Sequence, residues 1–324
     1  EIVSRDWSSD VCSSDLMATG HPMTVRPKWL RRTHEEPLDE ALEICDAHHH
    51  LWDHGPEDRY LVEEFLADID GGHRVTSSVH VDCFMGYRSS GPEELKPVGE
   101  TEFIHALTEP LQQGPVRVAA GIVGTANLSL GAAVAPVLEA HLAASPRFRG
   151  IRYWLNHEPQ AEAAGVRSDA PVGHAADPKV REGIALLSRY QLSFDAWIYF
   201  PQLPELIALA RAVPDTTIIL NHAGGLLGNG PYADRKAMYE RWTRDMADLA
   251  TCPNVHVKLG GFCVPRAGFG FHAQERPANS LELGHWLAPY VIYCIEKVGV
   301  ERCLFESNFP PDRKSTRLNS SHVK

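Results

Sequence analysis

Several features are missing from this sequence of 324 residues, and each absence narrows the range of functions. No apolar run is long enough to span a membrane and no signal peptide is recognisable, so we expect a cytoplasmic chain without a membrane partner. Positive charge is in deficit, because 31 Lys and Arg stand against 42 Asp and Glu, for a formal net charge of −11. That balance argues against nucleic acid as a partner.

Cysteine is scarce, and its spacing follows no pattern. The seven cysteines are scattered and contain no Cys-x-x-Cys motif. A disulfide framework or a cysteine zinc site would show ordered spacings, so reduced thiols are expected. The hydrophobic content of 44% is that of an ordinary globular chain, long enough to form one large domain around a single core.

The two ends of the chain differ in composition from the rest. Residues 1–16 contain a near-repeat, Trp7-Ser-Ser-Asp-Val11 followed by Cys12-Ser-Ser-Asp-Leu16, and residues 313–324 are polar and basic. Both segments resemble translated adapter sequence from assembled environmental reads, with natural disordered tails as the alternative. We expect residues 17–42 to form an N-terminal extension and residues 43–312 to form the folded domain.

Eight short apolar segments alternate with helical patterns inside that domain. Several read as continuous Val, Ile, Leu and Phe runs, which is typical of buried parallel strands. The predicted strands are Leu42–His48, Ser77–Cys83, Arg117–Gly124, Phe148–Trp154, Leu192–Tyr199, Thr216–His222, Val255–Gly261 and Cys303–Phe309. The helical patterns between them cover Leu61–Ile69, Gly131–Ala144, Pro178–Tyr190, Gln202–Ala212, Asp234–Ala250 and Ser280–Val298.

This alternation predicts an α/β fold, a (β/α)8 TIM barrel. The rival is an open doubly wound sheet, which would usually carry a glycine-rich phosphate turn after its first strand, where this chain has histidines. No helical pattern follows the eighth strand. We therefore expect a barrel that is C-terminally truncated after strand eight.

Histidines stand at two predicted strand ends, where the active sites of barrels lie. Side chains alternate along a strand, so His48 and His50 face the same way and can meet around one metal ion or one substrate carbonyl, while His49 faces away. Strand six ends in Asn221-His222 followed by Ala-Gly-Gly, a sequence that turns tightly. His48, His50 and His222 are the candidate metal ligands.

These segments resemble a known family when they are taken with three others, Gly121-Ile-Val-Gly124, Phe148-Arg-Gly-Ile-Arg152 and Ser307-Asn308-Phe309-Pro310. The chain is similar to the amidohydrolase-related (amidohydrolase 2) barrels, in the branch of 2-pyrone-4,6-dicarboxylate lactonase and the fuconolactonase-like enzymes. The resemblance spans about residues 43–312. It implies histidine ligands after strands one, five and six, and an aspartate at the end of strand eight.

The chain departs from that family pattern at two strand ends. Strand five offers Phe200 in place of a histidine, and strand eight offers Asn308 in place of the aspartate. An amide cannot act as a general base, and it is a weaker ligand than a carboxylate. Glu306 lies two residues earlier on the same face, so we expect it to supply the missing carboxylate. The alternative is a structural glutamate paired with Lys258 or Arg152.

The sequence thus predicts a hydrolase that opens a lactone of a small anionic substrate by water attack. One divalent metal, Zn²⁺ or Mn²⁺, would be weakly held, or the reaction would proceed without metal. The predicted catalytic residues are His222, Glu306 and Asn308, and the predicted substrate-binding residues are Arg152, Tyr153 and Lys258. For Arg152 and Lys258 a buried ion pair is the alternative. A decarboxylase of the same family and a non-catalytic barrel remain alternative functions.

Overall fold

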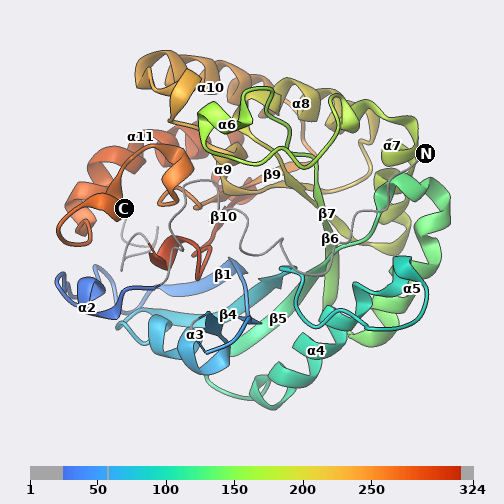
Figure 1. Ribbon diagram of the computed structural model, residues 1–324, viewed down its shortest axis with the longest axis horizontal. Coiled ribbons are helices and arrows are strands. Elements are labelled where there is room, and N and C mark those ends of the chain that lie inside the picture. Colours follow the sequence, from blue (N-terminus) through green and yellow to red (C-terminus); the bar gives the residue numbers. More distant parts are fainter. Residues whose placement is uncertain (1–24, 57, 315–324) are drawn as a thin grey trace.

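Eight parallel strands form one sheet in the computed structural model, which describes residues 25–56 and 58–314 (Figure 1). Their order in the sheet is their order along the chain. The strands are β1 (Glu43–His49), β4 (Arg74–Val81), β5 (Arg117–Gly124), β6 (Phe148–Trp154), β7 (Ser193–Trp197), β8 (Ile218–Leu220), β9 (Val255–Leu259) and β10 (Cys303–Phe305). A short hairpin, β2 (Trp52–Asp53) with β3 (Arg59–Tyr60), follows β1.

The sheet closes on itself beyond the end of β10. The backbone N–H of Asn308 donates to the carbonyl of His48 at 2.9 Å, and that of His50 donates to the carbonyl of Phe309 at 2.8 Å. These bonds join the last strand to the first, which makes the sheet a barrel. The (β/α)8 fold predicted from the sequence is confirmed. Of the two terminal segments, residues 1–16 and nearly all of 313–324 lie outside the described residues.

Helices surround the barrel and cover its outer face (Figure 1). They are α3 (Val62–Ile69), α4 (Val98–Thr108), α5 (Ala135–Ala144), α7 (Pro178–Leu187), α8 (Leu203–Ala212), α10 (Arg235–Leu249) and α11 (Ser280–Val298), with the one-turn helices α2 (Pro27–Leu30), α6 (Ala161–Ala164) and α9 (His222–Gly225). Among the described residues, no helix combines the length and apolar character needed to cross a membrane. The six described cysteines are all free thiols.

The barrel interior is partly polar, and this polarity positions the site. Strand residues such as Phe194 and Ile218 are fully buried and belong to the hydrophobic core. Between them, Asp195 of β7 and Lys258 of β9 are also buried, and they bond to each other across an intervening strand. Charged groups are rarely buried unless they are paired. The interior of this barrel therefore carries charge directly beneath the C-terminal ends of its strands.

Candidate active site

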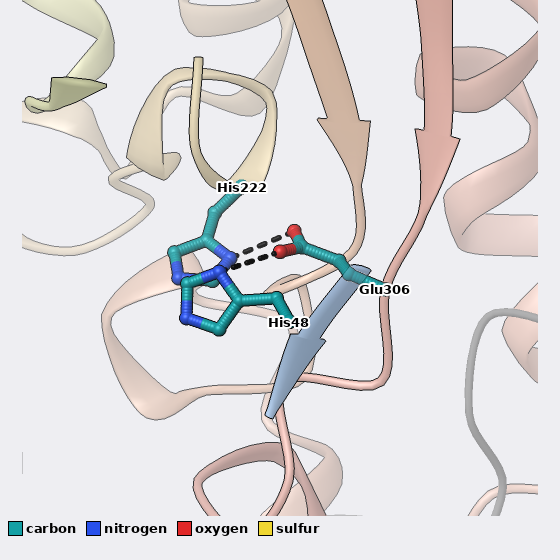
Figure 2. A group of neighbouring side chains, drawn as sticks. All are labelled: His48, His222 and Glu306. Carbon is teal, nitrogen blue, oxygen red and sulfur yellow. Dashed lines mark hydrogen bonds and ion pairs between the residues drawn. The ribbon is translucent and has the colours of Figure 1, made fainter. Parts of the chain in front are cut away.

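Two imidazoles and one carboxylate converge at the C-terminal end of the barrel (Figure 2). His222 Nδ1 lies 2.7 Å from Glu306 Oε1, and His48 Nδ1 lies 3.2 Å from Glu306 Oε2. The three side chains come from the ends of β8, β1 and β10 and are almost completely buried. One ligand atom from each lies within 4.8 Å of the other two. Two histidines with one carboxylate form a donor set that is typical of catalytic zinc.

The backbone around this cluster is strained, and glycines make room for it. His222 has φ of +55° and Asn308 has φ of +50°, a region that non-glycine residues rarely adopt. A Cβ atom on Gly260 would lie 2.4 Å from Cγ of Glu306, and one on Gly261 would lie 2.4 Å from Cγ of His222. The two glycines that follow β9 are therefore required by the close packing of the carboxylate and imidazole.

Hydrogen bonds assign the positions of the imidazole protons. His50 Nδ1 lies 2.7 Å from the carbonyl oxygen of Val81, an acceptor, so Nδ1 of His50 carries hydrogen and Nε2 is bare. Glu306 Oε1 accepts in the same way from Nδ1 of His222, and its Oε2 lies within ion-pair distance, 3.2 Å, of Nδ1 of His48. Figure 2 shows the second nitrogen of these two rings on the side away from Glu306. Nε2 of His50 and of His222 is thus available for a ligand, whereas at His48 the Lys258 ammonium, 3.4 Å from Nδ1, favours the opposite position of the hydrogen.

The spacing of two of these nitrogens fits a cation. His48 Nε2 lies 3.1 Å from His50 Nε2. Two bare nitrogens at that distance repel each other unless a proton or a cation lies between them, and zinc accepts imidazole nitrogen at about 2.0–2.1 Å. His50 contacts His48 but is not part of the tighter group with Glu306. The residues present therefore fit a divalent cation, with histidines as ligands and Glu306 as their hydrogen-bond acceptor or as a further ligand.

Burial dominates the electrostatics of the cluster. It lowers the pKa values of His48 and His50 well below the ordinary histidine value, and the Lys258 ammonium adds to this effect at His48. Burial also raises the pKa of Glu306 to about 8, while nearby Lys258 acts in the opposite direction. Neutral imidazoles are the form that binds metal, and a cation would favour the ionised carboxylate.

The other sequence-predicted residues lie around the cluster in different ways. Lys258 is buried and donates to Asp195 at 2.6 Å, which is the ion pair named above as the alternative to substrate binding. The Asn308 amide donates to Asp312 Oδ1 at 3.0 Å. Tyr153 lies on the other face of β6 from Arg152, and its hydroxyl contacts Ser129 and His174, so the structure does not bring it into the histidine cluster.

Arg152 is buried, and one donor of its guanidinium has no hydrogen-bond partner among the described residues. Its guanidinium is 6% exposed, stacks on the Trp154 ring at 4.7 Å, and leaves Nε without a hydrogen-bond partner among the described residues. The indole N–H of Trp197, on the neighbouring strand, is also buried without such a partner in the described part of the chain. The Trp197 ring lies 5.2 Å from the His222 ring. Unpaired buried donors beside the cluster are suited to an anionic or oxygen-rich ligand.

Sequence reasoning missed three residues of this region. Asp195 and Trp197 lie on β7, and Arg266, in the loop after β9, stacks on Trp197 at 4.7 Å. An aspartate in the middle of an otherwise apolar strand was a signal available in the sequence. Arg266 had no such signal, because its approach depends on the path of a long loop.

A second cluster lies at the end of β4 and can be separated from the first. His80 and Cys83 approach the buried carboxylate of Glu100 at 2.9 Å and 3.3 Å. That carboxylate also accepts the backbone N–H groups of Cys83 and Met85. Its oxygens are thus engaged in holding the loop after β4, which favours a structural role over metal binding.

Comparisons with known proteins identify the family of this chain. The family model described as Amidohydrolase matches residues 45–320. The uncharacterized protein y4mH of Sinorhizobium fredii is 30% identical over 299 residues, which cover 84% of this chain and 86% of that protein. The L-fucono-1,5-lactonase of Burkholderia ambifaria is 28% identical over 281 residues, which cover 83% of this chain and 80% of that enzyme.

Solved structures share the fold. An amidohydrolase from Burkholderia multivorans with bound zinc has a TM-score of 0.62 at 21% identity, covering 85% of this chain and 87% of that one. A probable 2-pyrone-4,6-dicarboxylic acid hydrolase from Acinetobacter baumannii with citric acid bound has a TM-score of 0.51 at 13% identity, covering 83% and 85%. Because the family model spans most of the chain, the resemblance seen in the sequence is confirmed, and this protein belongs to the amidohydrolase family.

Proposed function

We propose that this protein is a hydrolase that opens the ring of a lactone of a small anionic substrate. The observation that carries the proposal is the buried carboxylate of Glu306, which accepts a hydrogen bond from His222 and lies 3.2 Å from Nδ1 of His48 at the C-terminal end of the barrel. The lactonase of Burkholderia ambifaria, 28% identical to this chain, supports the same reaction class. A lactone carbonyl is reactive enough for a weakly held metal to suffice.

A divalent cation, zinc or manganese, would be held by Nε2 of His48 and of His50, and His222 would be the third donor if it does not serve as the base. When bound, such an ion polarises a carbonyl oxygen and lowers the pKa of water. The Val81 carbonyl orients the imidazole of His50, and Glu306 orients that of His222, each by accepting the Nδ1 hydrogen. Outer partners of this kind raise the basicity of histidine ligands and fix their tautomers.

His222 and Glu306 also form a pair suited to proton transfer. A bare Nε2 on His222 can take the proton of the attacking water and return it to the ring oxygen as the carbon–oxygen bond breaks. Glu306 stabilises the transient imidazolium through the Nδ1–H bond of 2.7 Å. The product is a hydroxy acid. In this arrangement His222 acts as a base, whereas full metal ligation would make it a third ligand.

Arg152 is the proposed anchor for the negative charge of the substrate. Its guanidinium is buried on Trp154, and its Nε has no partner among the described residues. An arginine fork binds a carboxylate in a bidentate manner. We assign no comparable role to Lys258, because its ammonium is engaged by Asp195.

The test is whether the protein opens the rings of a panel of sugar-derived and aromatic-derived lactones. A pH-indicator assay measures the acid that ring opening releases. The wild-type protein is measured after chelator treatment and after readdition of Zn²⁺ or Mn²⁺. We expect turnover of at least one anionic lactone and loss of turnover in His222→Ala. Retained zinc affinity in that variant would assign His222 as the base, and lost affinity would assign it as a ligand. If the protein releases carbon dioxide from aromatic acids and opens no lactone, it is a decarboxylase and the proposed hydrolase function is wrong.

A further inference from the structure

A buried ion pair lies beneath the histidine cluster. Lys258 is 2% exposed, Asp195 is fully buried, and their charged atoms are 2.6 Å apart. The same carboxylate oxygen accepts the side-chain N–H of Asn221 at 3.1 Å. Removing two charges from water often costs more than their attraction returns, so such a pair is weak evidence for a stabilising role. The chemistry next to the pair is the better guide to its purpose.

The Lys258 ammonium reaches the same atom of His48 that Glu306 reaches. Lys258 Nζ lies 3.4 Å from His48 Nδ1, and Glu306 Oε2 lies 3.2 Å from it. An ammonium can only donate a hydrogen bond, and a carboxylate can only accept one. Lys258 therefore favours His48 with a bare Nδ1 and its hydrogen on Nε2. Glu306 in its ionised form favours the reverse, with hydrogen on Nδ1 and a bare Nε2.

His50 makes this competition matter for metal binding. Because His50 Nδ1 donates to the Val81 carbonyl, its Nε2 is an acceptor, 3.1 Å from His48 Nε2. In the arrangement that Lys258 favours, His48 Nε2–H donates to His50, and both rings are satisfied without a cation. In the arrangement that Glu306 favours, both Nε2 lone pairs face each other, and a cation can bind them.

We propose that Lys258 is a positioning residue which stabilises the cation-free arrangement of His48 and so keeps divalent metal binding weak. Asp195 holds the ammonium in place for this purpose. The inference rests on the proposed function only in taking His48 and His50 as metal ligands.

The test is the zinc affinity of the full chain, measured by titration calorimetry without substrate. The double variant Lys258→Met/Asp195→Asn removes the ammonium, keeps similar volumes, and retains an acceptor for Asn221. We expect it to bind zinc roughly tenfold or more tightly than the wild type, the scale on which outer partners change metal affinity. Lys258→Arg, which keeps the cation, should stay within about threefold of the wild type. A folded double variant with equal or weaker affinity would overturn the proposal.

The direction of the change separates positioning from a merely structural role, because damage to the barrel interior would weaken zinc binding. The single variant Lys258→Met leaves the Asp195 charge unpaired and is expected to melt at a lower temperature. The zinc affinity of the double variant is therefore the decisive measurement. Lactone turnover is measured separately. Tighter zinc binding without turnover of any lactone would sustain this inference and refute the proposed function. Lactone turnover together with unchanged zinc affinity in the double variant would support the proposed function and refute this inference.

Discussion

Glu306→Gln is the substitution that examines the site most closely. Glutamine has the shape of glutamate, but it offers one acceptor oxygen and one N–H₂ group in place of two acceptor oxygens. Glu306 accepts from His222 Nδ1 at 2.7 Å and lies 3.2 Å from His48 Nδ1, so one of these two ring nitrogens would face the glutamine N–H₂ group. The carboxylate charge that stabilises an imidazolium is also lost.

The expected loss of activity follows from these two contacts. General base assistance contributes roughly 10²–10⁴-fold in rate, which corresponds to about 3–5 kcal/mol of transition-state stabilisation. We therefore expect kcat/KM for lactone opening to fall by about that factor. Zinc affinity should fall by roughly 10–100-fold, because the two imidazoles lose their common orienting partner.

The stability of the Glu306→Gln variant should rise or remain the same, although its activity falls. Burial raises the pKa of Glu306 from its ordinary value of 4.5 to about 8. At pH 7 this carboxyl group is ionised in the unfolded chain but largely protonated in the folded protein. The difference lowers the free energy of unfolding at pH 7 by about 3 kcal/mol. Glutamine removes that cost, but an imidazole donor left without an acceptor lowers the free energy of unfolding by about 1–3 kcal/mol. The melting temperature should therefore be equal or higher.

The assay pairs steady-state lactone hydrolysis with thermal unfolding. Glu158→Gln is the matched control, because Glu158 is also buried but bonds to Tyr232, away from the histidines. The control should keep its kcat/KM. A Glu306→Gln protein with kcat/KM within about threefold of the wild type would refute the reasoning. A fall in activity that merely follows a fall in melting temperature would assign Glu306 a structural role.

Three further predictions concern the surroundings of the site. Arg152→Met should raise KM for anionic lactones roughly tenfold and leave neutral lactones almost unchanged, and equal effects on both classes would contradict its role as an anion anchor. Gly260→Ala places a Cβ atom 2.4 Å from Cγ of Glu306, so both the melting temperature and kcat should fall; a fully active, stable variant would show that the loop yields. Burial lowers the pKa of His141 from 6.5 to about 4, so its neutral form contributes stability above pH 6.5 that is lost as the pH falls towards 4. Urea unfolding at pH 6.5 and at pH 4 should show a loss of about 3 kcal/mol in the free energy of unfolding, and a smaller loss in His141→Gln. A loss of the same size in that variant would mean that other groups cause it.

Much of the fold could be predicted because parallel barrel strands are buried on both sides. The strands Arg117–Gly124 and Phe148–Trp154 have the predicted bounds, since apolar residues predominate in each. The strand predicted over Thr216–His222 extends only over Ile218–Leu220, because the chain turns at His222 with positive φ. Helix α4 was missed, because its buried face includes Gly99, Glu100 and Thr101 and has little apolar periodicity.

The site was predictable where it depends on alternation along one strand. His48 and His50 were expected on one face, and their Nε2 atoms lie 3.1 Å apart. His49, expected to face away, bonds to Ser78 on the neighbouring strand. Glu306 was expected to provide a carboxylate, and it lies between two imidazoles, although its role in catalysis remains a proposal.

The sequence could not place side chains whose partners come from distant strands. The pairing of Lys258 with Asp195 joins β9 to β7 across the barrel interior, and no local pattern encodes such a contact. Tyr153 was expected beside Arg152, but neighbouring residues on a strand point to opposite faces, and its hydroxyl bonds to Ser129 and His174.

The central claim is that His222, oriented by Glu306, moves the proton that opens a lactone ring. The most direct measurement is the rate of ring opening by His222→Gln in comparison with the wild type, at saturating zinc and with the melting temperature of each recorded. The account predicts a loss of at least roughly 100-fold in kcat with little change in melting temperature. Wild-type turnover in a folded His222→Gln protein would contradict it.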